Sequence, residues 1–142
     1  MRILVSACLL GLCCRYDGKS KACAPVIALR EKGHELIPVC PEQLGGLPTP
    51  RTASERMGDR VKSVDGLDRT AAYDLGAEQA AKIYALLGCD CAILKARSPM
   101  CGKEQIYDGT FTGTLKPGQG VLAELLLKNG VPVYTEDEVA AI

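Results

Sequence analysis

The sequence predicts an α/β protein with a small Rossmann-like or flavodoxin-like fold, an open parallel sheet with helices on both faces. Short aliphatic runs alternate with longer helical patterns along the chain. The aliphatic runs are typical of strands that are buried on both faces, and Gly or Pro marks most of the boundaries between elements. At 142 residues the chain is expected to form one domain, residues 1–142, with a core of its own.

The first part of the chain contains two expected strands and one helix. Residues 2–7 form the first strand, because they are mostly aliphatic. Pro25 opens a helix that Gly33 ends, following the preference for proline at the first helical position and glycine just past the last. Residues 35–39 form the second strand, and Pro38 favours an edge position because proline donates no ladder hydrogen bond.

The rest of the chain begins with a region rich in turn residues. Residues 41–50 hold three prolines and a Gly-Gly pair, which predicts a rigid, irregular loop, and residues 61–68 are expected to be a short extended turn. A helix, a strand, a helix, a strand and a terminal helical turn are then expected over residues 71–87, 91–94, 121–128, 131–134 and 136–140. The apolar face of the first of these helices is expected to contain Ala72, Leu75, Ala80, Ile83 and Leu87.

Composition argues against several classes of partner. Lys and Arg total 17 and Asp and Glu total 17, so no net charge attracts the chain to nucleic acid or to a membrane surface. Five Tyr, one Phe and no Trp argue against a base-stacking platform for nucleic acid. The apolar run after Arg2 is shorter than a signal peptide requires, and no stretch approaches the ~20 residues of a membrane span. We therefore expect a cytoplasmic protein that acts on a small molecule.

Three of the eight cysteines follow apolar runs that are far apart in the sequence. They are Cys8, Cys40 and Cys101, each at the end of a strand or in the loop after one. Because the carboxyl ends of parallel strands meet at one edge of a sheet, their sulfurs are expected to converge where open α/β sheets bind ligands. Three thiolates bind a soft metal centre and leave one position of it open for chemistry.

The remaining cysteines do not form a recognisable metal motif. Cys89 and Cys91 are too close for a zinc knuckle, and they are expected to pack as small apolar side chains. The roles of Cys13, Cys14 and Cys23 stay open. A closed structural zinc site is disfavoured because no second Cys pair has the required spacing.

An alternative hypothesis is a thiol enzyme centred on Cys8. A cysteine after the first strand, followed by an arginine, is typical of the phosphate loop of low-molecular-weight phosphatases and arsenate reductases. That loop needs five intervening residues, whereas six lie between Cys8 and Arg15. A second alternative is a non-catalytic metal or sulfur carrier that uses the three converging thiolates.

Several motifs together resemble a bacterial family, the thiouracil desulfidases. The resemblance lies in the segments Ser6–Gly11, Cys14–Gly18, Cys40–Arg51 and Arg97–Gly102, and extends through residues 70–77 and 112–130. It implies a [4Fe–4S] cluster held by Cys8, Cys40 and Cys101, with sulfur removed from a thiolated pyrimidine base by non-redox hydrolysis. It also implies that Glu42 and Ser98 lie near the substrate.

The charged residues near these motifs have two possible roles each. Glu42 either takes a proton from water or stabilises the loop after Cys40. Arg51 and Glu55 have the spacing of an ion pair on a helix. Lys95 and Arg97 either neutralise the charge of a cluster or are solvated. Of the charged residues, only Glu42 is assigned a catalytic role.

Overall fold

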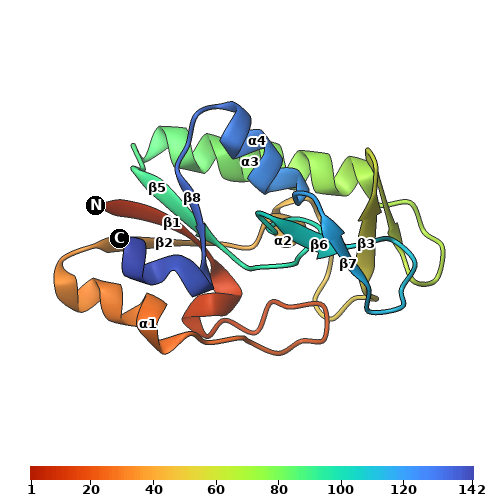
Figure 1. The fold of residues 1–142 in the computed structure, drawn as a ribbon, viewed down its shortest axis with the longest axis horizontal. Coiled ribbons are helices and arrows are strands. Elements are labelled where there is room, and N and C mark those ends of the chain that lie inside the picture. The colour runs from red at the N-terminus through yellow and green to blue at the C-terminus, as the bar shows by residue number, and fades with distance from the viewer.

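The computed structural model, which describes residues 1–142, has a four-stranded parallel sheet at its centre (Figure 1). Its strands are β1 (Arg2–Ser6), β2 (Glu35–Val39), β5 (Cys91–Leu94) and β8 (Val133–Thr135), in the order β2-β1-β5-β8. Among these four strands this is the order 2-1-3-4, which begins the flavodoxin-like order 2-1-3-4-5. After β1 the chain adds β2 on one side of it, and the later strands are added on the other side, beginning with β5. The switch point at which such sheets bind ligands is therefore expected at the carboxyl ends of β1 and β5. Pro38 lies on the edge strand, as predicted.

Helices cover both faces of this sheet, which confirms the predicted α/β class (Figure 1). One face carries α3 (Thr70–Leu86) and α4 (Val121–Lys128). The other face carries α1 (Ala24–Ile27), which continues as the 3₁₀ segment η2 (Ala28–Lys32), and the terminal 3₁₀ segment η3 (Glu136–Ala141). Leu4 packs with the α3 and α4 layer, whereas its neighbours Ile3 and Val5 pack with α1, because successive side chains of a strand point to opposite faces. No helix has the length and apolar character needed to cross a membrane.

The structure corrects the sequence-based expectations in two loop regions. Residues 41–50 begin with a short helix, α2 (Pro41–Leu44), which Pro41 favours because its missing N–H is not needed there. Of the residues expected to form an extended turn, 61–68, the first three lie in β4 (Arg60–Ser63), which forms a hairpin with β3 (Ser54–Met57). A second hairpin is formed by β6 (Gln105–Tyr107) and β7 (Leu115–Pro117), and the residues that join them, 108–114, are rich in Gly and Thr.

The two hairpins lie beyond the carboxyl ends of the central strands (Figure 1). Glu55, on β3, accepts hydrogen bonds from the backbone N–H groups of Gly109 at 2.9 Å and Phe111 at 3.0 Å. The helical ion pair that the spacing of Arg51 and Glu55 allows does not form. Glu55 lies on a strand, and its carboxylate binds these two backbone amides instead. The hairpins therefore form one wall over the edge of the sheet.

The buried face of α3 differs from the predicted one. Ala80 is buried, as predicted, but its buried neighbours are Tyr73, Gly76 and Ala77, whereas Leu75 and Leu87 are exposed. The reason is that α2 lies very close to α3: a Cβ atom at Gly76 would overlap the carbonyl oxygen of Pro41, and one at Gly45 would overlap that of Ala72. Small residues in α3 thus allow the approach of α2, which carries Glu42 and follows Cys40 directly.

Replacing Gly76 by alanine is expected to destabilise the protein by about 1–3 kcal/mol, because the new methyl group meets rigid backbone. Helix propensity alone would give the opposite sign, a gain of roughly 1 kcal/mol. Chemical denaturation of Gly76→Ala and of the exposed helix variant Glu78→Ala measures the difference. A Gly76→Ala protein as stable as the wild type would contradict the close contact of the two helices.

Candidate active site

A cavity of about 610 Å³ opens at the carboxyl ends of β1, β2 and β5. Its floor is formed by residues that follow these strands, and its far wall by residues of the two hairpins. This is the edge of the sheet, and the switch point, at which open α/β folds bind ligands. The volume is in the usual range for small-molecule sites.

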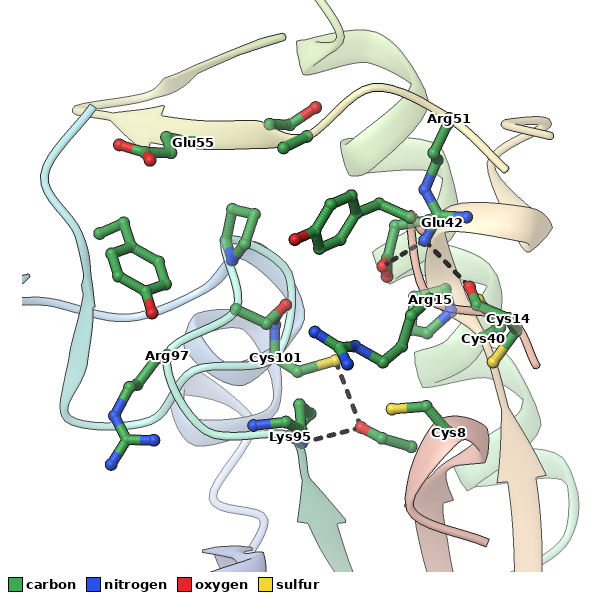
Figure 2. A pocket seen from close by; sticks show the side chains of 18 of the residues that line it. Cys8, Cys14, Arg15, Cys40, Glu42, Arg51, Glu55, Lys95, Arg97 and Cys101 are labelled. Atoms are coloured by element: carbon green, nitrogen blue, oxygen red, sulfur yellow. Dashed lines mark hydrogen bonds and ion pairs between the residues drawn. The ribbon is translucent and has the colours of Figure 1, made fainter. Parts of the chain in front are cut away.

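The three cysteines singled out from the sequence all line this cavity (Figure 2). Cys8 lies in the 3₁₀ turn η1 (Ala7–Leu10) directly after β1, Cys40 is the residue after β2, and Cys101 lies in the loop after β5. Cys8 and Cys101 are buried and Cys40 is half-buried. The parallel sheet thus brings together residues that are far apart in the sequence, as predicted from their positions at strand ends.

Cys14 is a fourth cysteine in the cavity, and its role was left open by the sequence. It is buried, and the sulfur of Cys40 lies 3.7 Å from its carbonyl oxygen. The neighbouring Cys14 thiol lowers the pKa of Cys40 below its usual value, although burial acts in the opposite direction. Cys13, in contrast, is exposed and does not line the cavity.

Cys8 and Cys101, the other two of the three cysteines, are neutral thiols when no metal is bound. Burial raises the pKa of Cys8 to about 11, and burial also raises the pKa of Cys101 well above its usual range. The nearby Glu42 carboxylate adds to both shifts. Without a metal these thiols therefore carry little charge at neutral pH, and metal binding would displace their protons.

Two serines support Cys101. The Ser98 hydroxyl oxygen accepts hydrogen bonds from the backbone N–H groups of Met100 and Cys101, both at 3.1 Å. Its own hydrogen remains available for a donor role at the cavity, which Ser98 lines. The second serine, Ser6, contacts the side chain of Cys101: its hydroxyl donates to the Cys101 sulfur at 3.4 Å.

Glu42 lies on the cavity side of α2 and is paired with Arg51 (Figure 2). The Arg51 Nη2 group donates to Glu42 Oε2 at 3.0 Å and to the carbonyl oxygen of Cys14 at 3.2 Å. The Arg51 side chain is only 3% exposed, so this contact is shielded from solvent. Burial raises the pKa of Glu42, and the charge of Arg51 opposes this shift.

The other basic residues of the cavity have different environments. Lys95 forms an ion pair with Glu136 at 2.9 Å, whereas Arg15 is 3.7 Å from Asp17 and extends into the cavity in Figure 2. Arg97 is exposed and has a positive φ of 69°. Lys95 and Arg15 both lower the pKa of Cys8, which means that they favour a thiolate at that position, although burial outweighs them.

The segment from Cys8 to Arg15 does not have the geometry of a phosphate loop. Four of its backbone N–H groups donate to backbone carbonyls: Gly11 to Cys8, Leu12 to Ala7, Cys14 to Leu12 and Arg15 to Lys19. A phosphate loop needs such amides free to surround an anion. This arrangement disfavours the phosphatase hypothesis.

Sequence reasoning missed the aromatic character of the cavity. The chain has six aromatic side chains, five Tyr and one Phe, and four of them line this cavity: Tyr16, Tyr73, Tyr107 and Phe111. They come from separate elements, so no local motif reveals them. Their gathering suits a planar ring, because aromatic side chains stack on such rings.

The donor set fits an iron–sulfur cluster. Thiolates are the ligands that such clusters prefer, and three strand ends supply them to one cavity. No group of three or more Cys, His, Asp or Glu side chains is spaced to hold a single metal ion. A four-iron cluster has a different requirement, because each thiolate binds a different iron.

Fold and cavity together define an open-sheet α/β protein with a ligand cavity of soft thiol donors and aromatic walls. The family model for 2-thiouracil desulfurase matches residues 3–138, so the chain belongs to this family. The chain is 36% identical over 147 residues to the uncharacterized protein YbbK of Bacillus subtilis (strain 168), an alignment that covers 96% of this chain and 97% of that protein. It is also similar to the solved structure of the [4Fe–4S]-dependent thiouracil desulfidase TudS, with a TM-score of 0.92 and 44% identity over 99% of this chain and 93% of that one.

Proposed function

We propose that this chain is a [4Fe–4S]-dependent desulfidase that removes sulfur from a thiolated pyrimidine base such as 2-thiouracil. The observation that carries this proposal is the arrangement of Cys8, Cys40 and Cys101, which come from three strand ends and line one cavity. Membership of the 2-thiouracil desulfurase family and the likeness to the desulfidase TudS support it.

In this proposal Cys8, Cys40 and Cys101 hold the cluster. When bound, a cluster with only three protein ligands supplies an open iron, a soft Lewis acid suited to the sulfur of a thiocarbonyl group. The overall reaction replaces C=S by C=O, consumes one water and releases hydrogen sulfide. Atoms and electrons balance without an electron acceptor.

The residues of the chain have distinct roles in this reaction. Glu42 takes a proton from the attacking water, and Arg51 holds the carboxylate in place through its 3.0 Å contact. Ser98, whose oxygen already accepts two amide hydrogens, donates its hydroxyl hydrogen to a polar atom of the base. The aromatic walls bind the faces of the ring.

The setting proposed for this activity is the cytoplasm of a bacterium, with residues 1–142 acting as one domain. An equal number of basic and acidic residues gives no attraction to a nucleic acid polymer or a membrane. The reducing conditions of the cytoplasm keep the thiols available for iron. The partner is then a small thiolated molecule alone.

Anaerobic purification or reconstitution is expected to give a brown protein with about four irons and four sulfides per chain. Incubation of this protein with 2-thiouracil is expected to release uracil and sulfide. Iron and sulfide analysis, visible absorption and chromatography of the products measure these outcomes. The cluster-free protein, prepared by chelation under anaerobic conditions, is the control and is expected to be inactive.

The same experiment separates the alternatives. A sulfur or metal carrier would bind iron and sulfide without turnover, and a phosphatase or arsenate reductase would act without iron. A protein that binds no iron under strict anaerobic conditions would contradict the proposed function.

A further inference from the structure

Ser6 is a buried polar residue that lines the cavity and has no role in the reaction proposed above. It is the last residue of β1 and is 3% exposed. Its hydroxyl oxygen accepts a hydrogen bond from the backbone N–H of Lys95 at 2.9 Å, and its hydroxyl donates to the Cys101 sulfur at 3.4 Å. No other side-chain hydrogen bond of Ser6 is present in the structure.

The two contacts determine how the hydroxyl is oriented. A serine hydroxyl has one hydrogen to donate. Because the amide of Lys95 occupies the acceptor side of Ser6, that hydrogen is directed at Cys101. Hydrogen bonds in such a chain strengthen one another in a buried, low-dielectric environment.

Ser6 also connects the segments that carry two of the cysteines. It lies two residues before Cys8, and Cys101 follows β5, the neighbour of β1 in the sheet. The Lys95 amide is the first beyond β5. The hydroxyl therefore links the carboxyl ends of β1 and β5 at the switch point of the fold.

We propose that Ser6 is a positioning residue for the iron–sulfur cluster: it fixes the Cys101 sulfur and, by hydrogen bonding to it, withdraws electron density from the ligand. This role rests on the proposed function, because it requires a cluster bound to Cys101. Hydrogen bonds to the ligand sulfurs make the reduction potential of a cluster less negative, since they stabilise the more negatively charged, reduced form. The same withdrawal of charge makes the irons stronger Lewis acids for a thiocarbonyl sulfur.

The test compares Ser6→Ala with Ser6→Thr, which keeps a hydroxyl, in the anaerobically reconstituted full-length protein. Ser6→Ala is expected to retain iron and sulfide but to show a more negative reduction potential than the wild type. The expected decrease in the equilibrium constant for one-electron reduction is up to about tenfold, equivalent to ~59 mV. Ser6→Thr is expected to keep the wild-type value. A dye-mediated redox titration, followed by visible absorption and electron paramagnetic resonance, measures the potential.

Ser63→Ala provides a matched control. Ser63 is 2% exposed, lies on β4 and hydrogen-bonds to Asp65 rather than to a cysteine. This variant loses a buried hydroxyl and the stability that depends on it, and it is expected to keep the wild-type potential. It therefore separates a general loss of stability from an effect on the cluster.

The outcomes have distinct meanings. Loss of the cluster from Ser6→Ala together with its retention in Ser6→Thr would also support the positioning role. A wild-type potential in fully loaded Ser6→Ala would overturn it and leave Ser6 as a partner of the Lys95 amide alone. Loss of the cluster from both variants would overturn it too, because the hydroxyl would not be what matters. A wild-type protein without iron would instead overturn the proposed function, and the role of Ser6 with it.

Discussion

Replacing Cys8, Cys40 or Cys101 singly by serine is expected to abolish both the bound cluster and the desulfuration of 2-thiouracil. Each variant removes one of the three soft donors, and a serine oxygen is a hard ligand that retains its proton at neutral pH. Two remaining thiolates hold a four-iron cluster poorly, because two irons then lack protein ligands. Iron and sulfide content, visible absorption and turnover under anaerobic conditions measure the effect.

Three other cysteines serve as controls for this experiment. Cys89 and Cys91 lie at the amino end of β5, away from the cavity, and Cys89→Ser and Cys91→Ser are expected to retain iron. Cys14→Ser is the sharper control, because Cys14 is buried beside Cys40 in the same cavity. Retention of iron in this variant is expected if the three-ligand assignment is right. A full cluster in any of the variants of Cys8, Cys40 or Cys101 would remove that residue from the ligand set.

The positions of these three cysteines could be predicted because they depend on one general property of parallel sheets. Aliphatic runs mark the strands, and the residues that follow such strands meet at one edge. The prediction needed only the strand ends, and β2 and β5 have the predicted bounds. It did not need the loops, whose conformation was less well predicted.

The contacts around the cysteines could not be predicted because they join residues across the fold. Arg51 has the helical spacing to Glu55, yet it pairs with Glu42 since Glu55 lies on a strand and binds backbone amides. The hairpin that supplies Tyr107 and Phe111 has strands of three residues each, too short for a periodic pattern.

The buried face of α3 shows the same limit in another form. A pattern of large apolar residues placed Leu75 in the core, but the close approach of α2 requires small residues, and Gly76 and Ala77 are buried instead. Hydrophobicity alone does not report how close two helices lie. Contact with α2 therefore decides which face of α3 is buried, and the pattern of apolar residues along the helix does not reveal it.

Glu42→Gln is expected to lower desulfuration by roughly 10²–10⁴-fold while the cluster assembles with a normal spectrum, because this is the usual contribution of general acid–base catalysis. The substitution keeps the size of the side chain, and the glutamine amide oxygen can still accept the hydrogen bond from Arg51. It removes the negative charge of the carboxylate and with it the ability to take a proton. Steady-state turnover of 2-thiouracil, normalised to iron content, measures the loss.

Glu55→Gln is the matched control, since Glu42 and Glu55 are the two glutamates that line the cavity. The Glu55 carboxylate accepts two backbone N–H groups, and a glutamine oxygen can still accept both. Turnover within a few-fold of the wild type is therefore expected. Equal losses in the two variants would indicate a general effect of removing negative charge from the cavity rather than proton transfer at Glu42.

The cluster content of Glu42→Gln separates the remaining possibilities. If Glu42 only stabilises the segment after Cys40, cluster occupancy and turnover should decrease together. The reason is that Cys40, which directly precedes α2, would be displaced from the cluster. If the rate is unchanged at full occupancy, Glu42 is not the base, and Ser98 or Asp17 becomes the next residue to test. A large loss of turnover at full occupancy is the result that assigns the proton transfer to Glu42, and Arg51 then has its place in the mechanism as the buried guanidinium that holds this carboxylate at the cavity.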